Sequence, residues 1–317
     1  MSQTVLITGG TGFLGKRLGI ALKNDYRVVL TGRNNKQNQA AAKFTGCEAM
    51  PLDVSSIEAV RDTIVEVRPD IIIHAAATKF VDLAEKFPME CIDVNVVGSQ
   101  NVARVAVERG VSAVVGISTD KAAPPVRNTY GMSKAIMERI FCSMDGKTDT
   151  RFFCARYGNV AWSTGSVLPI WKKMHAETGV IGTTGPDMTR FFFTVDDAVG
   201  LILRGLANLD TLHGKVLSMR MKSALIRDLL NVWIEEFGGR WEKIDGRPGE
   251  RNLEYLIGDL ELEHTTAVEL GGIEHYVISF NKRFENHVTV GLSSDNTERL
   301  SRDEIVSLLA NPPAEER

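Results

Sequence analysis

Two neighbouring segments carry side chains whose types and spacing suit proton transfer. Tyr130 and Lys134 are four residues apart, so a helix places both side chains on one face. A nearby ammonium favours the phenolate, and we therefore expect the pKa of Tyr130 to be lowered toward the range of a general base. Thr119, Asp120 and Lys121 precede this pair and add an acid and a second amine. Together these groups could take a proton from a hydroxyl, give one, and take one from carbon, which exceeds the needs of simple alcohol oxidation.

A glycine-rich segment near the amino terminus predicts a nucleotide-binding loop. Residues 4–8 are typical of a buried strand, residues 9–15 are rich in glycine, and residues 16–23 are typical of a helix. Glycine permits a tight turn and a close approach of backbone to a pyrophosphate, and phosphates favour the free N–H groups of a helix N-terminus. A purely structural turn is the alternative, but the strand before the loop and the helix after it favour the nucleotide site. The contacts expected from this loop are Gly9, Thr11, Gly12, Phe13, Leu14 and Gly15.

The end of the second expected strand, residues 26–31, bears on the choice of dinucleotide. An NAD site usually has an acidic residue there for the ribose 2′-hydroxyl, and none follows this strand. Arg33 and Lys36 could instead hold a 2′-phosphate, which favours NADP. The alternative is that one or both are solvated surface cations.

The composition is that of an ordinary globular protein. Of 317 residues, 44% are hydrophobic and 24% are charged, and the net charge is −3. No basic stripe indicates nucleic-acid binding, and no apolar run reaches membrane-spanning length. The four cysteines and six histidines lack metal-ligand spacing. We therefore expect a cytoplasmic protein with no metal, membrane or nucleic-acid partner, whose first residues build the nucleotide loop and are not a removable leader.

Strand and helix patterns alternate through the first half of the chain. This alternation predicts an α/β protein with a doubly wound parallel sheet of the Rossmann type. Residues 1–157 are expected to form the dinucleotide-binding domain. The pattern is irregular afterwards, so residues 158–317 are expected to form mainly a smaller substrate-binding domain, with some segments returning to the Rossmann domain.

After the second strand, short apolar runs predict further strands and longer amphipathic runs predict helices. Strands are expected at 47–50, 70–76, 111–117 and 151–155, and helices at 55–67, 88–109, 127–144, 195–207 and 225–236. Residues 162–165 and 179–188 are expected to be loops because they are rich in Gly, Ser and Thr. Ser301 and Glu304 match a capping box before an apolar helix.

Eight short segments together match the motifs of a known superfamily. They are residues 8–15, 74–77, 95–101, 118–123, 130–134, 156–160, 186–191 and 247–250. With them the chain resembles the extended short-chain dehydrogenases/reductases, and more closely their inverting UDP-N-acetylglucosamine 4,6-dehydratases, from residue 5 to about 256. The Thr-Asp-Lys segment at 119–121 and the Pro-Asp-Met-Thr-Arg-Phe segment at 186–191 are the most specific. Dehydratases that retain configuration at carbon 5 are similar but have glutamate in place of Lys121, so this residue indicates the inverting family.

The resemblance implies that NADP⁺ takes a hydride from carbon 4 of a nucleotide sugar and returns it to carbon 6. Tyr130 would take the 4-hydroxyl proton, and Lys134 would orient the nicotinamide ribose and tune the tyrosine. Lys121 would then remove the carbon-5 proton, while Asp120, in a region that Thr119 keeps polar, would help to expel the 6-hydroxyl as water. A lysine base must be neutral, so Lys121 is expected to need desolvation or a cationic neighbour. The alternative for Asp120 and Lys121 is an exposed turn pair.

Further site residues are carried over from the same resemblance. The additional cofactor contacts are Asp53, Val54, Ala75, Ala76, Ala77 and Asn95. Asp53 could instead be a turn former, and Asn95 could hold water or backbone, whereas His74 is expected to be a satisfied histidine near the core. The expected substrate contacts are Lys79, Tyr157, Asn159, Val167, Thr189, Arg190, Arg247 and Glu250. A guanidinium suits a diphosphate, although either arginine could instead be a structural ion-pair partner.

Three departures from the family pattern, Trp162, Thr164 and Asn252, fall in the expected sugar-nucleotide region and leave the exact sugar open. The favoured interpretation is an inverting 4,6-dehydratase that acts on a UDP-sugar and forms a homo-oligomer. A nucleotide-sugar epimerase is the second interpretation, and it would need Tyr130 and Lys134 but not Lys121 as a base. A non-catalytic NADP-binding sensor is the third, and it would need neither the acid nor the carbon base.

Overall fold

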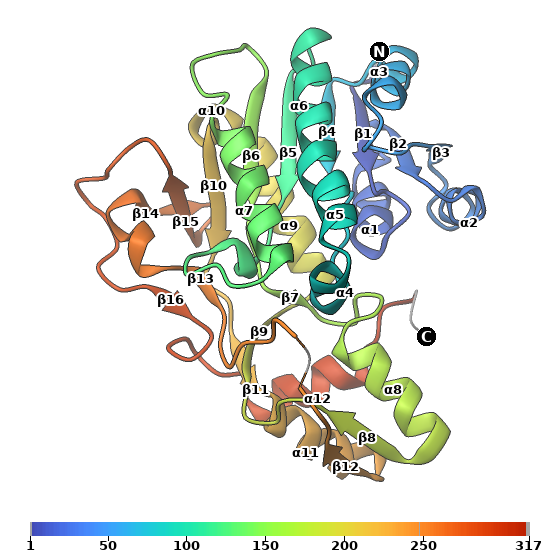
Figure 1. The fold of residues 1–317 in the computed structure, drawn as a ribbon, viewed down its shortest axis with the longest axis vertical. Helices are drawn as coiled ribbons and strands as arrows, with labels where there is room; N and C mark the ends of the chain where they lie inside the picture. The colour runs from blue at the N-terminus through green and yellow to red at the C-terminus, as the bar shows by residue number, and fades with distance from the viewer. Residues whose placement is uncertain (1, 247, 315–317) are drawn as a thin grey trace.

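The structure, a computed structural model, describes residues 2–246 and 248–314. Its centre is a nine-stranded sheet in the order β14-β15-β10-β6-β5-β4-β1-β2-β3 (Figure 1). From β10 to β3 all neighbouring strands are parallel, and β15 pairs antiparallel with β10 and β14. The parallel strands are β1 (Thr4–Thr8), β2 (Arg27–Gly32), β3 (Glu48–Pro51), β4 (Ile71–His74), β5 (Ala113–Ile117), β6 (Arg151–Ala155) and β10 (Lys215–Met219). The doubly wound α/β fold expected from the sequence is confirmed.

Helices cover both faces of the sheet (Figure 1). On one face α3 (Ile57–Val67) packs against α6 (Gly98–Glu108), which packs against α7 (Thr129–Cys142). On the other face α1 (Phe13–Leu22) contacts α9 (Val195–Ala207). Because both faces are covered, β1, β4 and β5 are buried along their whole length, and their sequences are continuous rather than alternating apolar runs.

The second half of the chain contributes to two places. β10, β14 (Thr265–Leu270) and β15 (Ile273–Ser279) extend the large sheet. The remainder surrounds a second apolar cluster that contains Trp162, Trp171 and Trp233. Its elements include β7 (Asn159–Val160), α8 (Val167–Thr178), β8 (Val180–Thr183), β9 (Thr189–Phe193), β11 (Ser223–Leu225), α11 (Ile226–Phe237), β12 (Arg240–Lys243) and α12 (Arg302–Ala310). We propose that this second part is the substrate-binding domain.

The long helix expected over residues 88–109 is interrupted. α5 (Pro88–Ile92) is followed by a π-helical turn, η1 (Asp93–Val97), and then by α6. A π-turn inserts an extra residue and redirects side chains, and such turns are frequent at functional sites. Asn95 lies in this turn, buried beside the candidate site. Apolar periodicity cannot reveal such an insertion, because the pattern on either side stays helical.

Several elements differ from the sequence-based expectation. α2 (Asn35–Thr45), α4 (Val81–Lys86) and α8 were not expected, and β8 lies inside a segment expected to be a loop. β8 pairs with β12, which is remote in the sequence, so its strand conformation depends on tertiary contact rather than local pattern. α7 begins later than expected because the side chain of Asn128 caps it, accepting a hydrogen bond from Gly131 N at 2.7 Å. The capping box is confirmed: Ser301 and Glu304 bond reciprocally at the start of α12.

Three further properties concern only the part of the chain that the structure describes. No helix there combines the length and apolar character needed to cross a bilayer. No group of three or more His, Cys, Asp and Glu side chains is arranged to hold a metal ion. The four cysteines are buried free thiols.

A buried ion cluster around Arg156 fastens the end of β6 to two other segments. The Arg156 guanidinium donates to both carboxylate oxygens of Glu138 on α7, at 2.9 and 2.7 Å, and to both of Glu261 in η3 (Asp259–His264), at 2.8 and 2.9 Å. Ser118, directly after β5, donates to Glu138 at 2.6 Å. Because Arg156, Glu138 and Glu261 are almost fully excluded from solvent, each charge depends on its partners.

We therefore expect Arg156→Met to be strongly destabilising. The substitution leaves two buried carboxylates without their counter-charge, and breaking such a cluster costs about 3–5 kcal/mol. The free energy of unfolding, measured by urea denaturation, should fall by that amount. Arg61→Met, which removes an exposed ion pair with Glu108 at 3.2 Å, is the control and should cost roughly 0.2–1 kcal/mol. Equal small losses in both variants would contradict the structural role of Arg156.

Candidate active site

A cavity of about 930 Å³ lies at the carboxyl ends of the parallel strands. Its walls come from the glycine loop, the segments that follow β4 and β5, the start of α7, and residues of the second part of the chain. In open α/β sheets this edge is where ligands bind. The cavity therefore collects most of the residues expected from the sequence to form a site.

The glycine loop lines part of the cavity, and its backbone is packed too tightly for side chains at Gly9, Gly10 and Gly15. Gly9 has a φ of +68°, and a Cβ there would lie 2.7 Å from the backbone of Ala76. A Cβ on Gly15 would lie 2.4 Å from Gly10. Gly9, Thr11, Gly12, Phe13, Leu14 and Gly15 all line the cavity. Gly12 is the N-cap of α1 and offers no side-chain cap, so the first N–H groups of that helix remain for a phosphate.

Of the two residues expected to distinguish NADP from NAD, Arg33 lies at the cavity and Lys36 does not. Arg33 lines the cavity; its side chain is 56% exposed and lies 3.9 Å from Glu90. Lys36, in the first turn of α2, is exposed and is not among the lining residues, which fits the alternative of a solvated cation. Asp53 and Val54 line the same region. A hydrogen bond from the Ser55 hydroxyl lowers the pKa of Asp53, which keeps this carboxylate charged.

The segment after β4 is held in place by buried side chains. Ala75, Ala76 and Ala77 line the cavity. Asn95 does not line it, but its side chain accepts from Thr78 N at 2.8 Å and donates to Thr78 O at 3.0 Å, so it holds backbone. His74 lies within hydrogen-bond distance of Thr8 Oγ1, at 2.8 Å, and Ser99 Oγ, at 3.0 Å. The expectation of a satisfied histidine near the core is confirmed. Burial also lowers the pKa of His74 to about 3, which keeps the imidazole neutral.

Tyr130 and Lys134 both face the cavity from the first turns of α7. A Cβ on Gly131 would lie 2.2 Å from Lys121 O, so glycine allows this helix to pack directly on the backbone of the Thr-Asp-Lys segment. The expected lowering of the tyrosine pKa is wrong: burial raises the pKa of Tyr130 to about 12, against the opposing effects of Lys121 and Thr119. Burial also lowers the pKa of Lys134 to about 8. Desolvation of Tyr130 outweighs the effect of its cationic neighbour, which is Lys121 and not the Lys134 assumed from spacing.

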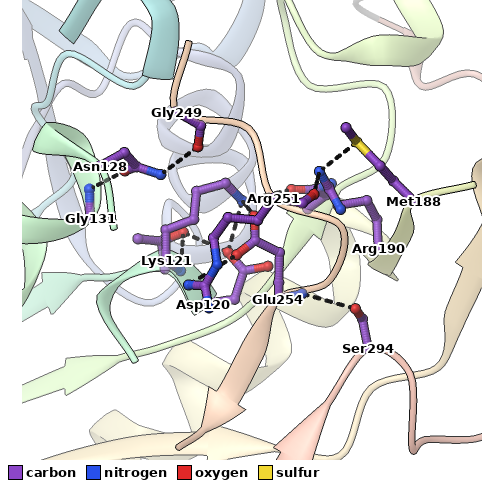
Figure 2. Close-up of polar contacts among 12 residues, drawn as sticks. Asp120, Lys121, Asn128, Gly131, Met188, Arg190, Gly249, Arg251, Glu254 and Ser294 are labelled. Atoms are coloured by element: carbon purple, nitrogen blue, oxygen red, sulfur yellow. Dashed lines mark hydrogen bonds and ion pairs between the residues drawn. The ribbon is translucent and has the colours of Figure 1, made fainter. Parts of the chain in front are cut away.

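Lys121 lies at the centre of a compact acidic cluster (Figure 2). Its Nζ donates to Asp120 Oδ1 at 3.0 Å and to Asn159 Oδ1 at 3.4 Å, and it lies 3.5 Å from Glu254 Oε1. Asp120 is fully buried and the Lys121 side chain is only 15% exposed, so the alternative of an exposed turn pair is wrong. Burial acts to lower the pKa of Lys121, but Asp120 and Glu254 together outweigh it and the pKa is raised. In this arrangement Lys121 is an ammonium, contrary to the neutral amine expected.

The expected substrate contacts divide into those on the cavity wall and those behind it. Lys79, Tyr157, Asn159, Val167, Arg190 and Glu250 line the cavity together with Thr119 and Lys121. Thr189 is buried and bonds to Ser294, and neither Thr189 nor Asp120 is a lining residue. Arg190 donates to the carbonyl oxygens of Thr189 and Arg251, at 2.8 and 2.6 Å. Arg247 lies outside the described residues.

Sequence reasoning missed Glu254, which is both a lining residue and a neighbour of Lys121. It precedes β13 (Tyr255–Ile257), and its backbone N–H donates to Ser294 Oγ at 3.0 Å. The only signal in the sequence was that Glu254 matches the family pattern although the residues directly before it do not.

Two of the departures from the family pattern have structural roles. Trp162 is buried, and its Nε1 donates to Leu308 O of α12 at 2.7 Å. Thr164 O accepts from Lys79 Nζ at 2.6 Å and so holds the loop across the cavity.

A family model described as polysaccharide biosynthesis protein matches residues 5–273. The chain belongs to this family. It is part of the extended short-chain dehydrogenase/reductase superfamily, so the resemblance inferred from the motifs is confirmed. The matched segment includes the glycine loop and the Lys121 cluster of this chain.

Two named activities occur among the relatives of this family member. The inverting UDP-N-acetylglucosamine 4,6-dehydratase of Campylobacter jejuni subsp. jejuni serotype O:2 is 35% identical over 294 residues, covering 89% of this chain and 84% of the relative. The UDP-glucose 4-epimerase of Rickettsia felis is 31% identical over 335 residues, covering 98% and 96%. Among solved structures, Pen from Bacillus thuringiensis superposes with a TM-score of 0.89 at 27% identity and covers 98% of both chains.

The placement of Arg33 and Lys36 generates a prediction about the cofactor. Arg33→Asp should weaken NADP⁺ binding relative to NAD⁺ by roughly tenfold to a hundredfold, the range for losing a hydrogen bond to a charged group. Lys36→Ala should leave the ratio close to that of the unaltered protein, because Lys36 lies away from the cavity. Calorimetric titration of both dinucleotides into the three proteins measures the ratios. Tighter binding of NAD⁺ than of NADP⁺ by the wild-type protein would contradict the role of Arg33 as the residue that holds the 2′-phosphate.

Proposed function

We propose that this protein is an NADP-dependent nucleotide-sugar 4,6-dehydratase that acts on UDP-N-acetylglucosamine and inverts carbon 5, giving a 4-keto-6-deoxy sugar. The observation that carries the proposal is the Lys121 amine on the cavity wall, close enough to Tyr130 to affect its ionisation. Of the side chains at this site, hydride transfer to and from carbon 4 would require only Tyr130 and Lys134. A second base beside them is what removal of a proton from carbon 5 requires.

The glycine loop, Arg33 and Asp53 fit the phosphates, 2′-phosphate and adenine of NADP, which when bound supplies the hydride acceptor and donor of the reaction. Tyr130 takes the proton of the sugar 4-hydroxyl. Its raised pKa makes the phenolate strongly basic once formed, and Lys121 acts to stabilise that phenolate. Lys134, whose pKa burial lowers to about 8, lies one helical turn along α7 from Tyr130 and would orient the nicotinamide ribose.

Lys121 takes the proton of carbon 5 after it has lost its own. Without a ligand the pKa of Lys121 is raised, so the amine carries a proton. A neighbouring carboxylate must accept this proton when the sugar binds and displaces solvent from the cavity. Asp120 at 3.0 Å and Glu254 at 3.5 Å are both within reach. The oxidised carbon 4 helps the step, because a ketone acidifies the hydrogen on the adjacent carbon.

Both parts of the chain supply groups for the UDP-sugar. Arg190 and Lys79 reach the cavity from opposite segments, and both already donate to backbone carbonyl oxygens. A diphosphate offers stronger, charged acceptors to the same donors. Tyr157, Asn159, Val167 and Glu250 line the same cavity. We assign the sugar nucleotide to this region.

A nucleotide-sugar 4-epimerase is the second candidate, and one observation favours it. The R. felis epimerase aligns over nearly the whole of this chain, further than the dehydratase relative does. The two activities make different use of Lys121. Epimerisation at carbon 4 leaves the carbon-5 hydrogen in place, so Lys121 would then serve only as a charge beside the sugar.

Incubation of the purified protein with UDP-N-acetylglucosamine tests the proposal directly. We expect a product lighter by one water in the mass spectrum. In heavy water, NMR should show solvent deuterium at carbon 5 with inverted configuration, and a carbon-6 hydrogen that came from carbon 4. A product of unchanged mass with altered carbon-4 configuration would favour the epimerase. No change in the substrate would favour a sensor or a different sugar.

Lys121→Met separates the two enzymatic candidates. The methionine fills the space of the lysine stem but cannot accept a proton, so water loss should slow by roughly a hundredfold or more, the scale for losing a general base. Oxidation at carbon 4 should persist and leave reduced nicotinamide on the protein, visible by its absorbance. Lys173→Met, on an exposed part of α8, is the control and should behave as the unaltered protein. Water loss at the normal rate in Lys121→Met would rule this lysine out as the base.

A further inference from the structure

Two short segments from different parts of the molecule touch each other at the cavity. Lys79 and Phe80 lie between β4 and α4, and they line the cavity together with Gly165 of the loop before α8. Lys79 Nζ donates to Thr164 O at 2.6 Å, and the Phe80 ring lies so close to Gly165 that an added Cβ would come within 2.6 Å of it. Figure 1 shows α4 beside this loop. We call these four residues the clasp.

Each half of the clasp is fixed to its own part of the molecule. Thr78, directly before the first half, is bonded to the Asn95 side chain through both its N–H and its carbonyl. Trp162, two residues before the second half, is 3% exposed, and its Nε1 donates to a carbonyl of α12. The φ angles of Trp162 and Gly165 are +61° and +73°, so the loop between them turns tightly. The two halves therefore move with their own parts, and opening the clasp separates those parts.

The clasp lies next to the groups expected to hold the dinucleotide. Residues 75–77 line the cavity directly before it, and their backbone packs against Gly9 of the glycine loop. A further contact lies on its other side, because a Cβ on Gly249 would come within 2.9 Å of Val81. Three successive residues, 79, 80 and 81, thus contact the second part of the chain. This segment joins two walls of the cavity.

We propose that the clasp controls the entry and release of the dinucleotide and keeps it on the protein between the two hydride transfers. The need for such retention rests on the proposed function. A hydride taken from carbon 4 must return to carbon 6 from the same nicotinamide, so loss of the reduced dinucleotide between the two steps would leave the sugar as an unfinished ketone. An ammonium has three donors, so Lys79 can hold Thr164 O and a diphosphate oxygen together. A bound UDP-sugar then ties the clasp while the chemistry proceeds.

A clasp made between protein groups has its own kinetic signature. Its contacts do not include the dinucleotide, so weakening them favours the open arrangement equally with and without that ligand. Association and dissociation should then accelerate by the same factor, and the dissociation constant, which is their ratio, should change little. A residue that binds the dinucleotide directly would instead raise the dissociation constant, mainly through faster release.

Phe80→Ala removes the aromatic contact of the clasp and leaves Lys79 in place. Stopped-flow fluorescence of NADPH should show both rate constants raised by roughly fivefold to tenfold, the factor that corresponds to the burial of about half an aromatic side chain. Phe44→Ala in α2 is the control and should change neither rate constant, because this phenylalanine is 43% exposed, against 41% for Phe80, and is not a lining residue. Unchanged rate constants in Phe80→Ala, or a raised dissociation constant with an unchanged association rate, would overturn the proposal.

Gly165→Ala tests the other half of the clasp. The added methyl group meets the Phe80 ring, so it should hold the clasp open and accelerate both steps. The φ of +73° also strains an alanine, and the double variant separates the two effects. Once residue 80 is alanine the ring is absent, and Gly165→Ala should accelerate exchange no further. Effects of the two substitutions that multiply would show independent action and would overturn the direct contact.

Turnover gives a second readout. With UDP-N-acetylglucosamine, Phe80→Ala should release NADPH into solution and slow with time, and added NADP⁺ should restore its rate, whereas the unaltered protein should need no addition. A protein that forms no dehydrated product but whose NADPH exchange accelerates in Phe80→Ala would refute the dehydratase function and support the clasp. Normal dehydration with unchanged exchange in Phe80→Ala would refute the clasp alone.

Discussion

The buried ion cluster around Arg156 fixes the relative positions of the segments that form the site. Its guanidinium, at the end of β6, joins Glu138 on α7 to Glu261 in η3, and Ser118 donates to the same Glu138. Tyr130 and Lys134 lie on that helix, and the Thr-Asp-Lys segment follows Ser118 directly. Because a buried charge without its partners lowers the stability of the fold, these segments are held in one relative arrangement. Residues remote in the sequence are thereby kept in fixed register around the cavity.

Close backbone packing provides the same precision where no charge is available. Glycine at position 131 lets α7 lie directly on the carbonyl of Lys121, and glycine at position 9 lets the nucleotide loop lie on the chain after β4. Any side chain at either position would push two functional segments apart. Asn95, in the π-helical turn, completes the arrangement by bonding to the backbone of Thr78 on both its N–H and its carbonyl.

Within this rigid frame, burial shifts three of the four central ionisable groups toward their neutral forms. The pKa of Tyr130 is raised to about 12, that of Lys134 is lowered to about 8, and that of Glu254 is raised. Lys121 differs because two carboxyl groups surround it and keep it charged. Strongly shifted groups of opposite type in one cavity are typical of sites that move protons. A sugar bound in the cavity would change the distribution of protons between Lys121 and its two acidic neighbours.

The sequence by itself determined the doubly wound sheet, the glycine loop, the Tyr130–Lys134 pair and the family, because each rests on a local pattern of residues. Only the tertiary structure decided that Lys36 lies away from the cavity, that Asp120 lies behind its wall, and that Glu254 reaches Lys121. It also reversed the expected pKa shifts at Tyr130 and Lys121. Burial and charge at one residue are set by segments far away in the chain, and no spacing along the sequence records which of those segments will meet.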